Sequence, residues 1–171
     1  MHPERGMNMA CLGVLYAITD IELAMLCNKP EEERYEYMLR EIEEDLLGTP
    51  RSYGLDKAWQ GIQLCLSGGR WSECNRVPMN IVVGGKFLVD TKDDLISLKD
   101  HIDIKDIVYY LQHYRVEDLI CKNYPKVEQN YNDLPAYVTD LEYLLANAKG
   151  LLSFYEYAQK EDLQVIFTVD L

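Results

Sequence analysis

The sequence is short of histidine and contains no recognisable catalytic motif. Only three histidines occur in 171 residues, and none belongs to the His-Glu-x-x-His pair that binds zinc in metalloproteases. A Gly-x-Ser-x-Gly nucleophile elbow and a Walker-type phosphate loop are also missing. The sequence therefore assigns no catalytic residue. We expect no cofactor and no metal site, and we favour a protein that is not an enzyme.

Basic residues are also scarce. The chain has 17 Lys and Arg against 29 Asp and Glu, which gives a net charge of −12 and a pI near 4.6. Nucleic-acid binding requires clustered Lys and Arg, so this charge excludes a nucleic-acid partner. An acidic surface favours solubility or a basic protein partner instead.

Long apolar runs and paired cysteines are absent too. The longest apolar stretch, Met9–Ile18, is about half the length that a membrane helix needs. Residues 1–6 carry both charge signs, unlike a secretory signal, so we expect a cytoplasmic protein with no membrane contact. The five cysteines are odd in number, and no pair has the two-residue spacing of a zinc or redox motif. Reduced thiols are the expected state.

The apolar residues that are present indicate one α+β domain, with several helices packed around a small mixed or antiparallel sheet. An apolar fraction of 48% in 171 residues is enough for one continuous core. Helix- and strand-type spacing predicts the order of elements. We expect strands over residues 7–18, 81–83, 95–98 and 163–169, helices over 19–28, 30–47, 55–66, 100–113, 116–121 and 138–159, and a loop over 126–137.

Several helix ends have sequence signals of their own. Thr19 with Glu22 three residues later is a capping box, and Asp100 with Asp103 repeats the spacing. Gly150 falls inside the predicted final helix, where a glycine costs about 1 kcal/mol against alanine. We therefore expect close packing against a neighbour at Gly150.

One stretch around Trp59 has two interpretations. In the first, Asp56 only starts a helix and the neighbouring side chains are structural. In the second, a pocket lies near Trp59 and the glycine turns, because Gln63 sits one helical turn from Trp59 on the same face. The candidate pocket residues are Asp56, Lys57, Trp59, Gln63, Ser67, Gly68, Gly84 and Gly85.

Tyrosine is abundant, with 13 in the chain and most in its second half. Tyrosine is enriched at protein interfaces because it combines apolar area with a polar tip. An interface and ordinary half-buried packing are both consistent with this pattern. The tyrosines concerned are Tyr109, Tyr110, Tyr114, Tyr124, Tyr131, Tyr137, Tyr143, Tyr155 and Tyr157.

Taken together, the motifs resemble the YfbM-like family of bacterial proteins, which has no established function. The resemblance covers nearly the whole chain and rests on Ile18-Thr19-x-x-Glu22-Leu23-x-x-Leu26 with Pro30, Leu55-Asp56-Lys57-x-Trp59 through Leu66-Ser67-Gly68, Val83-Gly84-Gly85, the unit from Leu98 to Leu111, and Tyr124-Pro125 with the final helix and strand. It implies an α+β fold and a bacterial cytosolic source, and it transfers no catalytic residue. The family pattern starts near Met7, so we expect residues 1–6 to be a leader and residues 7–171 to be a single domain.

Three hypotheses about function follow. The first is a non-enzymatic protein-binding module that docks a basic partner, such as a toxin, because acidic surfaces speed such association. The second is a small-molecule-binding protein or enzyme with the pocket near Trp59. The third is a structural homo-oligomer.

Overall fold

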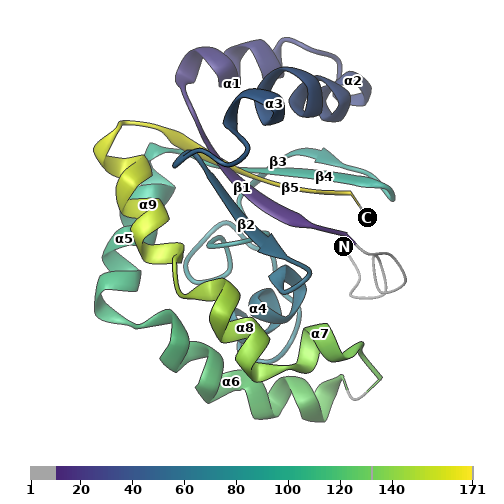
Figure 1. Cartoon of the computed structure of the whole chain (residues 1–171), viewed down its shortest axis with the longest axis vertical. Helices are drawn as coiled ribbons and strands as arrows, with labels where there is room; N and C mark the ends of the chain where they lie inside the picture. The colour runs from purple at the N-terminus through teal and green to yellow at the C-terminus, as the bar shows by residue number, and fades with distance from the viewer. Residues whose placement is uncertain (1–10, 132, 171) are drawn as a thin grey trace.

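A five-stranded antiparallel sheet forms the middle layer of the molecule (Figure 1). The computed structural model describes residues 11–131 and 133–170, so the expected leader at residues 1–6 lies outside the described residues. The strand order is β2-β1-β5-β4-β3, and every neighbouring pair is antiparallel. The strands are β1 (Gly13–Ile18), β2 (Ser52–Asp56), β3 (Lys86–Asp90), β4 (Asp94–Lys99) and β5 (Gln164–Asp170).

A small helical layer covers one face of this sheet. Its elements are α1 (Asp20–Cys27), α2 (Glu31–Tyr37), the π-helix η1 (Met38–Glu43) and α3 (Glu44–Leu46). The predicted capping box of Thr19 and Glu22 starts α1. Helical spacing over residues 30–47 predicts one apolar stripe of Tyr35, Met38, Leu39, Ile42 and Leu46. Met38, Ile42 and Leu46 are buried against the sheet and Tyr35 is partly buried there, whereas Leu39 is exposed. The π-helical middle of this stretch was not predicted.

A larger helical layer covers the other face and contains the main core (Figure 1). It consists of α4 (Trp59–Leu66), α5 (His101–His113), α6 (Val116–Asn130), α7 (Ala136–Thr139), α8 (Leu141–Ala148) and α9 (Leu151–Lys160). Asp100 caps α5 together with Asp103, as the sequence predicts. The architecture is therefore a single α+β domain with helices on both faces of an antiparallel sheet.

The strand predicted before the Gly84-Gly85 turn was wrong. Residues 81–83 are fully buried, as expected, but they lie in a series of turns rather than in a strand. The N–H groups of Ile81 and Gly84 donate to the carbonyls of Pro78 and Met79, which bends this apolar run back on itself. The strand at this point of the chain is β3, which starts at Lys86.

The helix predicted from residue 55 begins later, because Leu55 and Asp56 belong to edge strand β2. Asp56 has a φ of 50°, in the left-handed region, and this conformation turns the chain out of the strand. The helix α4 then starts at Trp59.

The second half of the chain contains two more corrections. Helix α6 does not stop before Pro125 but continues through it to Asn130. A buried stripe of Val116, Ile120, Asn123 and Val127 runs along α6, and its packing outweighs the local cost of proline. Residues 126–130 of the predicted loop are therefore helical.

The single helix predicted over residues 138–159 is divided into α7, α8 and α9. Gly150 lies between α8 and α9 and acts as the N-cap of α9. A Cβ atom at Gly150 would lie 2.6 Å from Cε2 of Tyr53, so the expected close packing is present.

Candidate functional site

Trp59, the centre of the predicted pocket, lies in the main core. Its side chain is 3% exposed, and its indole N–H donates to the carbonyl of Cys11 at 3.2 Å. Its ring packs 5.7 Å from the ring of Phe167 and 6.2 Å from that of Trp71, measured between ring centroids. Trp59 therefore belongs to the interior rather than to the wall of an open ligand pocket.

Gln63 is fully buried and organises the loop between α4 and β3. Its Nε2 donates to the carbonyls of Ser72 and Met79 at 2.5 and 2.9 Å, while its Oε1 accepts from the N–H of Val83 at 3.0 Å. Ser67 assists, since its Oγ also donates to the carbonyl of Ser72 at 3.0 Å. The amide of Gln63 thus replaces the backbone ladder that this irregular loop lacks.

Two of the predicted glycines, Gly84 and Gly85, allow the close backbone packing of the loop between α4 and β3. A Cβ at Gly84 would lie 2.5 Å from the carbonyl oxygen of Cys74 and 2.6 Å from that of Met79. Gly85 has a φ of 129°, a conformation that a side chain would disfavour. Gly68 has a φ of 79° and follows the end of α4. Gln63, Ser67, Gly84 and Gly85 are therefore brought together around one loop, whereas Gly68 is an exposed turn residue.

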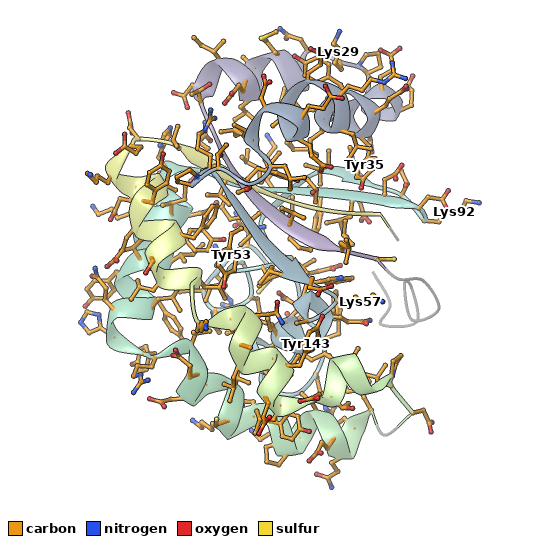
Figure 2. All side chains as sticks on the ribbon, viewed as in Figure 1. Lys29, Tyr35, Tyr53, Lys57, Lys92 and Tyr143 are labelled. Carbon is orange, nitrogen blue, oxygen red and sulfur yellow. The ribbon has the colours of Figure 1, made fainter. Side chains whose placement is uncertain are left out.

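Asp56 and Lys57 lie at the far end of α4, away from that loop. Asp56 does not cap α4, whose N-cap is Ala58; its Oδ1 accepts from the N–H of Lys57 at 2.8 Å. That N–H is also 3.3 Å from the phenol oxygen of Tyr143 on α8. Burial, and then a hydrogen bond with Asp56, raise the pKa of Tyr143. Figure 2 shows Lys57 and Tyr143 together where β2 ends beside α8.

A buried polar cluster around Lys99 was missed by sequence reasoning. The Lys99 cluster consists of Asn80, Ser97, Lys99, Asp103 and Tyr155. Lys99 is completely buried, and its Nζ donates to the carbonyl of Val82 at 2.5 Å and to Ser97 Oγ at 2.7 Å. The phenol of Tyr155 donates to the carbonyl of Ile81 at 2.5 Å, so this cluster also contacts the α4–β3 loop.

Burial dominates the electrostatics of the cluster. It holds the pKa of Lys99 well below its usual value of 10.5, although the carboxylate of Asp103 acts in the opposite direction. It also raises the pKa of Asp103 and of Tyr155. Among the described residues, no carboxylate forms a salt bridge with Lys99, so the amine fits its site as a neutral group.

The alternation along β4 assigns Lys99 to one face of the strand, but it does not indicate that this face is buried. Ile96 and Leu98 point to the small core, which leaves Ser97 and Lys99 on the other face with Leu95. Such alternation is typical of a strand with one face in water. Here both faces of the sheet are covered, so the polar face is buried as well.

The outer surface of the small helical layer has a different character. The guanidinium of Arg34 forms hydrogen bonds within the protein. It donates to the carbonyls of Lys29 and Leu88 at 3.1 and 2.8 Å. Arg40 pairs with Glu36 at 2.6 Å on the exposed side. We call the exposed carboxylates of this layer the acidic face: Glu31, Glu32, Glu33, Glu36, Glu41, Glu44 and Asp45.

An open groove of about 320 Å³ runs along the acidic face. It is lined by three carboxylates together with one aromatic ring and two cations: Glu33, Glu36, Glu41, Tyr37, Lys29 and Arg40. The amine of Lys29 lies 5.0 Å from the ring centroid of Tyr37. Figure 2 shows Lys29 on the outer side of this layer and Tyr35 on the side turned to the sheet.

The tyrosines of the second half are mostly structural. Tyr155 is fully buried, whereas Tyr109 and Tyr114 are 66% and 56% exposed. Five more are half-buried against the main core: Tyr110, Tyr124, Tyr131, Tyr143 and Tyr157. A tyrosine interface would therefore centre on Tyr109 and Tyr114.

Metal-ligand clusters and membrane-spanning helices are both missing from the described residues. Within residues 11–131 and 133–170, no group of three or more His, Cys, Asp or Glu side chains is arranged to hold a metal ion. None of the helices in this part of the chain has both the length and the apolar character needed to cross a bilayer. Burial, with a further contribution from Cys121, raises the pKa of Cys65 to about 12, so its thiol is not activated.

Comparison with known families decides the classification. The model of a family described as a domain of unknown function, DUF1877, matches residues 9–168. The chain belongs to this family. The fold of this DUF1877 domain is similar to the crystal structure of YfbM from Escherichia coli, a protein of unknown function. The TM-score is 0.65 at 15% sequence identity, over 92% of this chain and 99% of that chain.

These comparisons confirm the resemblance to YfbM-like proteins and the α+β fold. At 15% identity the structural similarity shows the fold alone. A comparison with proteins of curated function finds no match. The function is therefore inferred from the residues of this DUF1877 domain.

Proposed function

We propose that this DUF1877 domain is a non-enzymatic binding protein that docks a basic protein partner on its acidic face. The observation that carries the proposal is the charge of the helical stretch from Glu31 to Leu46. Seven carboxylates of this stretch reach solvent, against two arginines, of which Arg34 is bound to backbone carbonyls and Arg40 pairs with Glu36. This excess of negative charge attracts a partner of opposite sign and speeds the encounter.

The groove on this face supports a basic partner more than a neutral one. Glu33, Glu36 and Glu41 converge on it, and Tyr37 adds an aromatic wall. Arginine and lysine side chains pair with carboxylates and stack on aromatic rings. The Arg40–Glu36 pair is largely exposed, so a partner's guanidinium could replace Arg40 at small cost.

The same proposal places the domain in the bacterial cytoplasm, where a toxin or nuclease is one basic partner of suitable charge. The similar fold comes from a bacterial protein. The described residues form no disulfide, which is usual for proteins of a reducing compartment.

Charge-neutral variants test this proposal. The triple variant Glu33→Gln, Glu36→Gln, Glu41→Gln removes the carboxylates of the groove, while Asp106→Asn, Asp118→Asn, Glu142→Gln removes the same charge from exposed sites on α5, α6 and α8. Each protein is immobilised and exposed to a bacterial lysate at low and high salt, and retained proteins are identified by mass spectrometry.

We expect the unmodified domain and the control variant to retain the same basic protein, and high salt to release it. The groove variant should associate with that protein about tenfold more slowly. Equal binding by the two triple variants would refute the acidic face as the docking site. Retention of no basic protein across replicates would refute the proposal as a whole.

A further inference from the structure

A short buried segment depends on side chains from three separate elements. We call residues 79–83 the roof segment, because it covers the Lys99 cluster. Gln63 of α4 binds its two ends, at Met79 and Val83. Between them, Tyr155 of α9 donates to the carbonyl of Ile81, and Lys99 of β4 donates to that of Val82.

The contacts of Lys99 match a neutral amine. A neutral amine has two N–H donors, and the structure supplies two acceptors, Val82 O and Ser97 Oγ. The face of the Phe167 ring on β5 lies 5.5 Å from Nζ and would attract an ammonium, but it supplies no lone pair for a third N–H, and this attraction is small beside the cost of burying a charge. Protonation would create a third N–H and a full charge in a site without solvent contact.

The groups that face Lys99 do not compensate for that charge. Asp103 of α5 is the carboxylate that acts on Lys99, and it does so without an ion pair. The phenol of Tyr155 is already committed to the roof segment. The amide of Asn80 donates to Asp103 Oδ1 at 3.4 Å, while its Oδ1 is buried without a hydrogen-bond partner.

We propose that the protonation state of Lys99 controls the opening of the roof segment. The neutral amine holds residues 79–83 closed, and protonation releases them. Release hydrates the ammonium and gives Asn80 Oδ1 access to a water donor. It also exposes the hydroxyl of Ser97. The bonds from Gln63 Nε2 and Ser67 Oγ to the carbonyl of Ser72 lie outside residues 79–83 and keep the rest of the loop attached, so the opening is local.

The direction with pH follows from burial. A buried lysine binds its proton less tightly in the closed state than in the open state, so a fall in pH favours the open state. One linked proton changes the opening equilibrium by up to tenfold per pH unit between the two pKa values, because one pKa unit corresponds to a tenfold change.

Hydrogen exchange at residues 79–83 measures this opening. Exchange is followed by mass spectrometry from about pH 5 to about pH 10, the range between buried and exposed lysine pKa values, and is corrected for the intrinsic rate. We expect protection of the roof segment to fall with pH in the unmodified domain. In Lys99→Met it should not depend on pH, whereas the control Lys105→Met, at an exposed position on α5, should follow the unmodified domain.

A spectroscopic titration keeps the proposal testable if Lys99→Met does not fold. The NMR shifts of Lys99 Cε and Nζ report directly whether the amine is charged. We expect them to change below the usual lysine pKa of 10.5, together with the loss of protection. An unchanged pH dependence in Lys99→Met, or a Lys99 that titrates at the usual lysine value, would overturn the proposal. Neither result bears on docking at the acidic face.

Discussion

The two faces of the sheet are covered by helices but are stabilised differently. The small core beneath α1–α3 is apolar except for the phenol of Tyr16, which is fully buried and donates to Glu43 Oε2 at 2.7 Å. The main core on the other face contains Gln63, Ser97 and Lys99 as fully buried polar residues. Each of them contributes to holding the α4–β3 loop.

This difference shows where buried polarity is needed. The small layer consists of α-helices and one π-helix, which satisfy most of their own backbone groups. The α4–β3 loop has few backbone partners, so side chains must satisfy it. Buried polar residues are concentrated in the main core. The exposed carboxylates of the acidic face lie on the small layer instead.

Replacing Gln63 with leucine should have the largest effect. Gln63→Leu keeps the volume of the side chain and removes three hydrogen bonds. The N–H of Val83 is left without this partner, whereas the carbonyls of Ser72 and Met79 still accept from Ser67 Oγ and from the N–H of Gly84. An unsatisfied buried group costs about 1–3 kcal/mol and a lost hydrogen bond about 1 kcal/mol, so we expect a loss of about 2–4 kcal/mol in the free energy of unfolding. Urea denaturation measures it. Gln129→Leu on the exposed side of α6 is the control, and a loss below about 1 kcal/mol for Gln63→Leu would contradict the role given to Gln63.

A methyl group at Gly61 tests the packing of the main core. A Cβ there would lie 2.4 Å from the carbonyl oxygen of Val138 and 2.6 Å from Leu144 Cδ2. We expect Gly61→Ala to lower the free energy of unfolding by about 1–3 kcal/mol, because overpacking forces the helices apart.

The matched variant is Gly54→Ala on β2, where a Cβ would have no atom within 4 Å. It should be neutral, or stabilising by up to about 1 kcal/mol through the unfolded state. Equal losses for the two glycines, measured by thermal unfolding, would contradict the packing described for α4.

Removing the phenol oxygen of Tyr16 tests the small core. Tyr16→Phe leaves the ring in place and deletes its bond to Glu43. We expect a loss of about 1–2 kcal/mol, because the acceptor is charged but partly reached by solvent. Tyr109→Phe, at a position that is 66% exposed, should show no loss. A loss as large as that of Gln63→Leu would remove the contrast between the two faces.

The smallest expected effect concerns the contact between the two layers. Asp20 of α1 accepts from Gln164 of β5 at 2.7 Å and contacts His101 of α5 at 2.9 Å. The hydrogen bonds from His101 and then Gln164 lower the pKa of Asp20. Its contribution is therefore present above the unfolded-state pKa and is lost as the pH falls through the lower folded-state pKa.

We expect Asp20→Asn to make the loss of stability in acid slightly shallower. Urea denaturation at intervals below about pH 6 measures the slope. Asp45→Asn on α3, an exposed residue outside this contact, is the control. An acid slope that is identical in Asp20→Asn and the unmodified domain would show that this contact does not couple the layers.

Much of the fold could be predicted because its signals are local. The capping boxes at Thr19 and Asp100 involve residues three apart, and both are present. The buried stripe from Met38 to Leu46 follows helical spacing, so it survives even the π-helical turn. Strands β1, β4 and β5 were expected from apolar runs for the same reason.

The candidate site was predicted only in part. Gln63 and Gly84 were identified as neighbours, but their role proved to be support of a loop. Lys99 was missed, and β2 and β3 were not predicted, because these strands are short and depend on partners far away in the chain. The continuation of α6 through Pro125 depends likewise on burial against α4.

The sequence alone indicated the family, the α+β class, the capped starts of α1 and α5 and the acidic character, since each depends on composition or on spacing within a few residues. That both faces of the sheet are covered became evident only from the folded chain. That arrangement places Lys99 and Gln63 in the interior and leaves the carboxylates of the small layer in water. Burial depends on how the elements pack together. No local pattern could therefore distinguish a solvent-exposed lysine from a buried lysine that donates to a loop carbonyl.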